Sequence, residues 1–92
     1  MNALRIASSD SVAVAVRDIT AGEPIVLNPE QETGVRARQA VPFGHKVAIV
    51  HVPEGGQVIK YGHPIGRARH DIVPGDHVHV HNLASVRGAA RR

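Results

Sequence analysis

The sequence has no cysteine and no tryptophan, and it has only one phenylalanine and one tyrosine among 92 residues. Without cysteine, disulfide bonds, thiolate chemistry and zinc sites with cysteine ligands are excluded. With so few aromatic rings, the core has to be built from valine, isoleucine, leucine and alanine. A chain of this length buries only about two-thirds of its unfolded surface. We therefore expect one small domain that relies on a partner chain, or on a second copy of itself, for further burial.

Long apolar runs are also missing. The longest unbroken run covers residues 12–16, far short of the roughly 20 residues that a membrane-spanning helix needs. Residues 1–6 lack the apolar stretch of a secretory signal. We therefore expect a cytoplasmic protein with no membrane partner.

The formal net charge is +3, and much of it comes from arginines near the C-terminus and from Arg67 and Arg69. The aromatic side chains that stack on bases are nearly absent, and no nucleic-acid-binding module is recognisable. This charge favours an ordinary basic surface, or an anionic substrate or partner, over a nucleic acid. We expect no nucleic-acid partner.

Several catalytic motifs are absent. The sequence has no glycine-rich phosphate loop and no serine nucleophile elbow. Its acidic residues are scattered over predicted turns and do not form the carboxylate pair of a glycosidase. A complete set of catalytic groups is therefore hard to assemble from this chain alone.

Short β-branched segments separated by Gly and Pro turns predict an all-β protein. The predicted strands cover residues 12–17, 24–27, 46–50, 57–60, 64–69 and 77–81. No stretch has a convincing helical period, and residues 29–40 predict a long loop or a weak hairpin around Thr33-Gly34. The ends, residues 1–9 and 88–92, have few apolar anchors and are expected to be mobile, which leaves a core of about residues 10–84 in a single domain.

One turn pattern recurs in residues 18–25, 51–58 and 71–78. Each copy reads polar residue, β-branched residue, two turn formers, glycine, two further residues and β-branched residue. The shared glycine, at Gly22, Gly55 and Gly75, suits a positive φ. The copies are unequally spaced, so the pattern does not indicate a solenoid. It favours an internal pseudo-repeat over the chance recurrence of glycine turns.

Histidine and valine alternate from His77 to His81. The period of two predicts a strand with His77, His79 and His81 on one face and Val78 and Val80 on the other. Two imidazoles at positions i and i+2 can converge on one metal ion when a third ligand comes from elsewhere, and the third histidine of the run then lies outside the site. The alternative is a solvated strand face of titrating histidines.

Two further segments carry candidate site residues. Pro42 and Gly44 define a tight turn that presents His45, a candidate general base or anion ligand, and Lys46, a candidate contact for a carboxylate. Neighbours on a strand point to opposite faces, so only one of the two is expected to face any one site. Lys60 and Arg67 form a candidate cationic rim for an acidic substrate. Solvated surface charge is the alternative for all of these residues.

Five of these segments, in order, resemble the small SAF domain of the altronate dehydratase family, whose relatives include galactarate dehydratase and the small subunit of sulfolactate sulfo-lyase. The segments are Asp10-Ser11-Val12-Ala13-Val14-Ala15, Pro42-Phe43-Gly44-His45-Lys46, Val58-Ile59-Lys60-Tyr61-Gly62, Ile65-Gly66-Arg67-Ala68 and His77-Val78-His79-Val80-His81-Asn82-Leu83. The resemblance covers roughly residues 10–84. Any one segment alone is a weak signal, but the ordered run of five is specific. The resemblance implies a β-clip, an all-β unit of hairpins folded over one another with long loops and little or no helix.

The resemblance also implies a function. Members of this family eliminate water or sulfite from the α and β carbons of a 2-hydroxy acid, assisted by a divalent metal that is commonly iron. The expectation is thus the small subunit of a hydro-lyase acting on a sugar acid such as altronate or galactarate, or of a sulfo-lyase acting on sulfolactate. A large catalytic subunit is expected to hold most of the contacts to the metal, Fe(II), and the isolated chain is expected to be inactive.

The site residues follow from the matching positions and from the residues discussed above. The expected catalytic residues are His45, Lys46, His79 and His81, and the expected substrate-binding residues are Gly44, Lys60, Arg67 and Asn82. His79 and His81 are the expected metal ligands. His63 stands where the family pattern Tyr-Gly-Glu carries an acid. If that acid contacts metal or substrate, this protein takes a different substrate.

Other functions remain open at this point. The chain is alternatively a non-catalytic binding or assembly module, in which the histidine strand docks a partner chain or a carboxylated ligand. A third hypothesis, a relative in carbohydrate binding or in pilus or flagellar assembly, requires an export signal, which residues 1–6 do not show.

Overall fold

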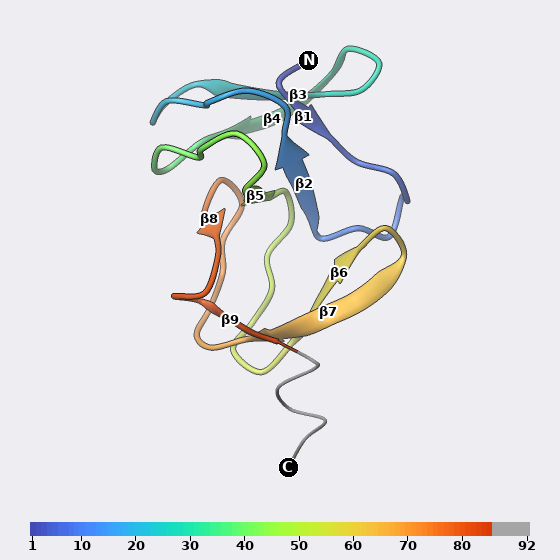
Figure 1. Ribbon diagram of the computed structural model, residues 1–92, viewed down its shortest axis with the longest axis vertical. Helices are drawn as coiled ribbons and strands as arrows, with labels where there is room; N and C mark the ends of the chain where they lie inside the picture. The colour runs from blue at the N-terminus through green and yellow to red at the C-terminus, as the bar shows by residue number, and fades with distance from the viewer. Residues whose placement is uncertain (86–92) are drawn as a thin grey trace.

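The computed structural model describes residues 1–85, which form an all-β structure (Figure 1). The strands are β1 (Ala3–Leu4), β2 (Val12–Ala15), β3 (Pro24–Leu27), β4 (Gln31–Arg36), β5 (Lys46–Ala48), β6 (Gln57–Lys60), β7 (His63–Ala68), β8 (His77–Val78) and β9 (Leu83–Ser85). No helix in this part of the chain is long and apolar enough to cross a membrane. The all-β prediction is confirmed.

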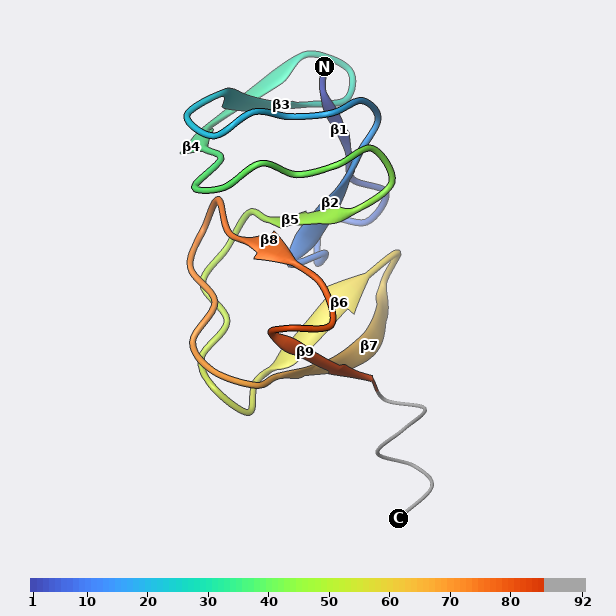
Figure 2. The same cartoon turned by 60° about the vertical axis from the view of Figure 1, so that its left-hand side comes forward.

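The strands form three small antiparallel sheets. The central sheet has the order β1-β2-β5-β8, the pair β3-β4 lies at one end of the molecule, and the sheet β6-β7-β9 lies at the other (Figures 1 and 2). In the central sheet Lys46 pairs with Val78, and Val47 pairs with His77. Paired residues share a face of the sheet, so Val47 and His77 lie on one face and Lys46 and Val78 on the other.

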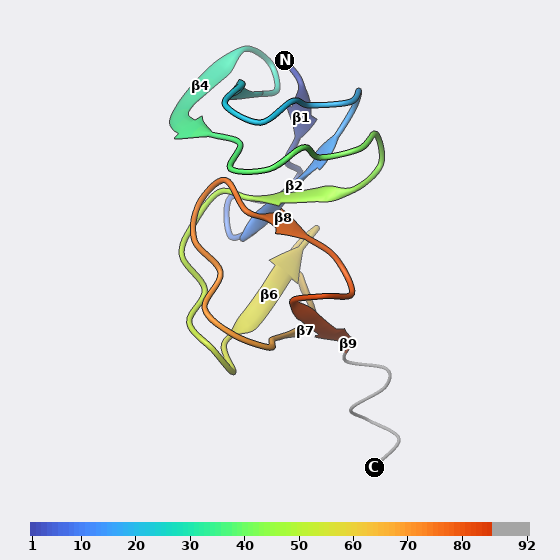
Figure 3. The ribbon, with the colours of Figure 1, turned by 90° about the vertical axis from the view of Figure 1, so that its left-hand side faces the viewer.

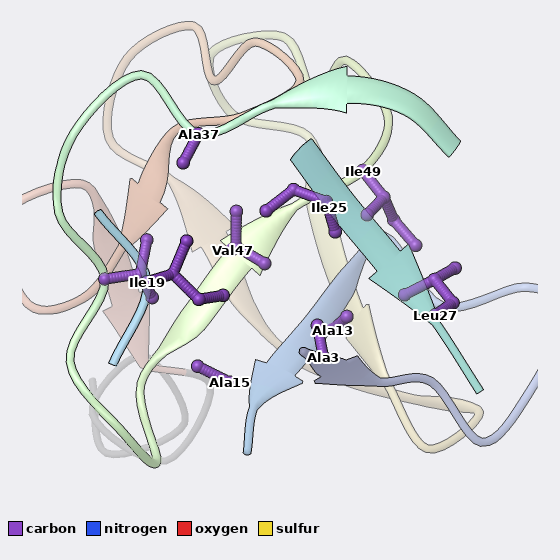
Figure 4. Close-up of a cluster of buried hydrophobic side chains, with 10 residues drawn as sticks. Ala3, Ala13, Ala15, Ile19, Ile25, Leu27, Ala37, Val47 and Ile49 are labelled. Atoms are coloured by element: carbon purple, nitrogen blue, oxygen red, sulfur yellow. The ribbon is translucent and has the colours of Figure 1, made fainter. Parts of the chain in front are cut away.

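Two clusters of aliphatic side chains form the core, one on each face of the central sheet. The first lies toward β3-β4 (Figure 4) and consists of Ala3, Ala13, Ala15, Ile19, Ile25, Leu27, Ala37, Val41, Val47 and Ile49. The second lies toward β6-β7-β9 and consists of Val12, Ala48, Val52, Val58, Ala68, Ile72 and Val78. Phe43 and Tyr61, the only aromatic residues of the types Phe, Tyr and Trp, are exposed. The core is aliphatic, as the composition predicted.

The predicted turn repeat is confirmed, and it occurs four times rather than three. Gly22, Gly44, Gly55 and Gly75 all have a positive φ, between 79° and 96°. In each copy the glycine N–H donates to the carbonyl of an alanine on another segment. The N–H of that alanine donates in return to the carbonyl of the residue after the glycine. The additional copy, residues 40–47 and second in chain order, escaped the sequence pattern because Ala40 stands at its polar position and Phe43 at a turn position.

The four copies pair two by two. Ile19 of the first copy exchanges two backbone hydrogen bonds with Val41 of the second, at 2.8 and 2.9 Å. Val52 of the third copy exchanges two with Ile72 of the fourth, both at 2.8 Å. The domain is therefore built from two similar halves. The second copy leads into β5 and the fourth leads into β8. These two strands pair with each other in the central sheet.

Residues 31–36 are a strand, β4, although they were predicted to lie in a loop or weak hairpin. Only Thr33 and Val35 of this segment are half-buried, while the other four side chains are exposed. The Thr33 hydroxyl donates to the Ile25 carbonyl at 2.8 Å, which helps to hold β4 against β3. Two half-buried positions in a polar segment give too weak an alternation to predict a strand.

The prediction that residues 1–9 lie outside the core is wrong. Ala3 is fully buried, and β1 pairs with β2. The buried Asn2 amide bonds to the Pro24 carbonyl and the Val26 N–H, both at 2.8 Å. One small apolar residue and one amide leave no periodic signal in the sequence. The other predicted mobile end, residues 88–92, lies outside the described residues.

Gly75→Ala is expected to destabilise the protein more than Gly22→Ala. Both glycines have a positive φ, so either alanine costs about 1–2 kcal/mol in backbone strain. A Cβ at position 75 would also lie 2.2 Å from the Arg36 carbonyl oxygen, whereas a Cβ at position 22 meets nothing within 4 Å. Urea unfolding of the two variants measures the difference, and equal losses would contradict this account of the turn.

Candidate functional site

Four imidazoles gather at the free edge of the central sheet, and we refer to His45, His77, His79 and His81 as the imidazole cluster. The centroid of the His45 ring lies 4.3 Å from that of His79 and 5.0 Å from that of His77. The rings of His77 and His79 are 5.7 Å apart, and His81 lies 5.4 Å from His77. The rings of His45, His77 and His79 are nearly parallel, whereas His81 is tilted by 43° to His77.

The pairing of β5 with β8 explains why His45 joins the run of histidines. Lys46 pairs with Val78, so one step further along the same register His45 lies opposite His79. These two residues share a face with His77, because side chains two residues apart on a strand point the same way. The sequence predicted that His77, His79 and His81 gather, but it did not predict that His45 lies among them.

The predicted strand over residues 77–81 is wrong beyond Val78. After β8 the chain forms a turn, in which the N–H groups of Asn82 and Leu83 both donate to the His79 carbonyl, at 3.1 and 2.9 Å. Val80 is consequently 72% exposed and does not share the buried face of Val78. His81 nevertheless returns to the cluster from the turn.

Asn82, one of the expected substrate-binding residues, holds the backbone of the neighbouring histidines in this structure. It is buried, with 2% of its surface exposed. Its Oδ1 accepts from the His79 N–H at 2.9 Å, and its Nδ2 donates to the His77 carbonyl at 2.8 Å. Because the side-chain amide already bonds to the backbone on both ends, it holds the two histidines in place.

Gln39 is a second residue that positions the cluster, and the sequence analysis missed it. Its Oε1 accepts from the His77 N–H at 2.8 Å, and its Nε2 lies 3.3 Å from Asp76 Oδ1. Gln39 and Asn82 together bind the outward backbone N–H and C=O of the edge strand at His77. The signal for Gln39 is weak, because it lies in a polar segment remote in sequence from the histidines.

A surface hollow of about 330 Å³ borders the cluster. Its lining consists of Gln39, His70, Asp76, His77, His81 and Asn82. This volume is at the lower end of the range found for small-molecule sites. The hollow gives a small ligand a route to the rings of His77 and His81.

Burial and neighbouring basic groups lower the pKa of two imidazoles in the cluster, His77 and His79. The pKa of His77 is lowered first by burial and then by His45, His81 and other basic neighbours. The pKa of His79 is lowered by burial and then by His45 and Lys46. Since an imidazole with a pKa below 6.5 is mostly neutral at pH 7, both rings are available as bases or as ligands.

Of the two candidate lysines, Lys46 adds positive charge near these rings, and Lys60 adds positive charge near Lys46. Burial lowers the pKa of Lys46, and the charge of Lys60 lowers it further. The Lys46 side chain leaves the sheet on the face opposite to that of His77. Its ammonium group is nevertheless close enough to lower the pKa of both His77 and His79. Lys60 lies with its Nζ 4.8 Å from the centroid of the Tyr61 ring.

Two other expected site residues, Gly44 and Arg67, do not contribute side chains to the imidazole cluster. Gly44 forms the turn before His45, where the His45 N–H donates to the Pro42 carbonyl at 2.9 Å. The Arg67 guanidinium donates to the Gly55 carbonyl at 2.9 Å, on the β6-β7-β9 sheet, rather than to the cluster. The structure thus brings together His45, His77, His79 and His81, with Lys46 near the rings and Lys60 near Lys46.

The antiparallel hairpins and repeated glycine turns of this helix-free structure are consistent with a β-clip domain of the SAF type. The family model described as the altronate/galactarate dehydratase SAF domain matches residues 1–86. The chain belongs to this family.

Individual relatives fall into two groups. The chain is 43% identical over 82 residues to an altronate dehydratase from Escherichia coli (strain K12), a match that covers 89% of this chain but only 16% of that protein. It is 37% identical over 84 residues to the (2R)-sulfolactate sulfo-lyase subunit alpha of Chromohalobacter salexigens, covering 87% of this chain and 89% of the relative. The same subunit from Paracoccus pantotrophus is 36% identical over 63 residues, which cover 68% of this chain and 94% of the relative. The chain thus spans a small part of the dehydratases and nearly all of each sulfo-lyase subunit.

Asn82→Ala is expected to destabilise the protein by about 1–3 kcal/mol, because it leaves the His79 N–H and the His77 carbonyl without their partners. Asn82→Asp is the matched control, since it keeps an acceptor for His79 and loses only the donor to His77. Urea unfolding measures the stability, and ¹H–¹³C spectra of the imidazoles report whether the cluster rearranges. Unchanged spectra and stability in the alanine variant would contradict the positioning role.

The stability of the protein is expected to fall as the pH decreases from 6.5. His77 and His79 have lower pKa values folded than unfolded, so the unfolded state binds more protons in this window and the free energy of unfolding decreases. Glu23, whose pKa is lowered to about 2 by hydrogen bonds from Arg17 and Thr20, adds a further loss only below pH 4.5. Urea unfolding between pH 5 and 8 tests this, and the double variant His77→Gln/His79→Gln should flatten the curve between about pH 5 and 7.

Proposed function

We propose that this chain is the small SAF-domain subunit of a lyase that removes water or sulfite from an anionic 2-hydroxy acid, acting with a large catalytic subunit. The observation that carries the proposal is the gathering of four imidazoles at one sheet edge, with Lys46 close to them. The names of the relatives, altronate dehydratase and sulfolactate sulfo-lyase subunit alpha, support the substrate class: a sugar acid such as altronate or galactarate, or sulfolactate.

The chemistry of elimination suits these side chains. The reaction removes a proton from the carbon next to a carboxylate, which requires a base that is neutral near pH 7, and imidazole is such a base. We assign proton transfer to His81, because it is exposed and its ring centroid lies 5.4 Å from that of His77. Lys46 and Lys60 supply positive charge that stabilises the carboxylate as negative charge develops on it.

The divalent metal that the family resemblance implies, expected to be Fe(II), fits other donors of the same cluster. One ring nitrogen from each of His45, His77 and His79 lies within 4.8 Å of the other two, and imidazole is a common ligand of iron and zinc. His81 is not part of this group, although His79 and His81 were the expected pair. A bound metal would supply a Lewis acid for the carboxylate or for the departing group.

A large partner subunit would complete the site. Phe43 is 67% exposed in the turn before His45, and Val80 is 72% exposed in the turn after His79. The connection that leads into β5 and the connection from β8 to β9 lie on the same side of the molecule (Figures 2 and 3). A partner that covers this side would bury both apolar side chains and exclude water from the cluster.

A binding or assembly module is the second candidate function. The same exposed Phe43 and Val80 would then serve only to dock the partner, and the large subunit would hold all the chemistry. The two functions make different predictions for variants that remove reactive groups and leave Phe43 and Val80 unchanged.

In the complex with its large subunit, Lys46→Met and His81→Ala are each expected to lower kcat by about 100-fold or more, because each removes a charge or a proton-transfer group used in the transition state. His51→Ala is the control, since His51 is exposed and lies 3.9 Å from Asp71, away from the cluster. Release of sulfite from sulfolactate, and of 2-keto acid from altronate or galactarate, measures the activity. Gel filtration measures assembly.

The outcomes separate the two candidate functions. A loss of kcat with intact assembly supports a shared active site. Loss of assembly in both variants, or unchanged activity in both, favours the binding module. No product from any of the three acids would overturn the proposed substrate class, and turnover by the isolated chain with added Fe²⁺ would show that the large subunit is not needed.

A further inference from the structure

We infer that His45, His77 and His79 form a binding site for a divalent transition metal that this chain holds on its own, without ligands from a partner. The inference stands on the geometry of these residues and does not depend on the proposed lyase function. It differs from the sequence-based expectation in two ways: the ligands are His45, His77 and His79 rather than His79 and His81, and they all belong to this chain rather than mainly to a large subunit.

The positions of the ring nitrogens carry the inference. His45 Nδ1 and His77 Nε2 are 2.8 Å apart, so one hydrogen bond already joins them. A nitrogen of His79 completes the trio, with all three atoms within 4.8 Å of one another. A cation between these nitrogens would replace the shared proton, which moves to the other nitrogen of its own ring, so each ring stays neutral.

The backbone around each ligand is held by hydrogen bonds. The His45 carbonyl accepts from the Ala15 N–H at 2.9 Å. The His77 N–H donates to Gln39, and the His79 N–H donates to Asn82, at 2.8 and 2.9 Å. The three side chains are therefore positioned before any metal binds, which reduces the entropy lost on binding.

The chemistry of the three side chains selects the class of metal. All three rings are half-buried, and their donors are nitrogens only. Nitrogen donors favour zinc, copper, nickel and iron over calcium and magnesium, which prefer oxygen. Three protein ligands leave a coordination position open, as in catalytic rather than structural zinc sites.

The other histidines are not expected to take part. His81 is exposed, its ring is tilted by 43° to that of His77, and it lies outside the trio. His51 lies near Asp71 at the turn before β6. His81 and His51 therefore provide matched controls, one inside the imidazole cluster and one outside it.

The test uses the untagged 92-residue chain and the metal alone. Titration with Co²⁺ is expected to give visible d–d absorption that saturates at one equivalent, and Zn²⁺ is expected to displace the Co²⁺. His45→Ala, His77→Ala and His79→Ala should each weaken Co²⁺ binding by about 100-fold or more, since each removes a ligand outright rather than a supporting contact. His81→Ala and His51→Ala should change the affinity by less than about threefold, under 1 kcal/mol.

A second measurement does not depend on variants. In ¹⁵N spectra of the wild-type imidazoles, one equivalent of Zn²⁺ should shift His45 Nδ1, His77 Nε2 and one nitrogen of His79, and leave His51 and His63 unchanged. The inference is overturned if Co²⁺ binding does not saturate, if His81→Ala abolishes binding while His45→Ala does not, or if Zn²⁺ shifts only exposed histidines. Since no turnover is measured, a chain that binds metal but supports no lyase activity would overturn the proposed function and leave the metal site standing.

Discussion

The fold depends on one repeated backbone contact, in which the N–H of a glycine with positive φ donates to the carbonyl of a buried alanine. It occurs at Gly22, Gly44, Gly55 and Gly75, with lengths between 2.7 and 2.9 Å. The left-handed backbone turns the chain sharply, and the small alanine lets the turn approach the neighbouring strand closely. Each contact fixes where the next strand begins.

This contact also determines where the functional side chains lie. The turn at Gly44 starts β5 and the turn at Gly75 starts β8, so the register between these strands places His45 opposite His79. The cluster lies on the edge strand, where backbone groups would otherwise be free to pair with another chain. The amides of Gln39 and Asn82 bind these groups at His77, which both blocks the edge and orients the histidines.

Four neighbouring imidazoles would repel one another if they were all protonated. The structure limits this repulsion at His77 and His79, whose lowered pKa values favour the neutral ring. Burial lowers the pKa of His77 and His79, and each neighbouring ring would repel a second proton. Such a cluster is poorly suited to be an inert surface. It is suited to tasks that need neutral nitrogen, namely accepting a proton and ligating a metal. Lys46 lies close enough to the rings to add positive charge there, and Lys60 lies near Lys46.

Features that depend on near neighbours in the chain could be predicted from the sequence. These include the all-β class, the aliphatic core, three of the four glycine turns and the bounds of β3 and β6, since each reflects a period of two or a turn residue within a few positions. The five ordered motifs predicted the family as well. The gathering of His77, His79 and His81 was also predicted, although the chain turns after Val78 and His81 reaches the other rings from that turn.

Features that depend on pairing between distant segments could not be predicted. His45 joins the cluster only because β5 and β8 are paired in one particular register. Gln39 holds the cluster only because its amide meets the backbone of the distant edge strand, and β1 and β4 exist only because partner strands cover them. A hydrogen bond between residues more than 30 positions apart leaves no local pattern in the sequence. Only the tertiary structure therefore determined that His45 and Gln39 belong to the site.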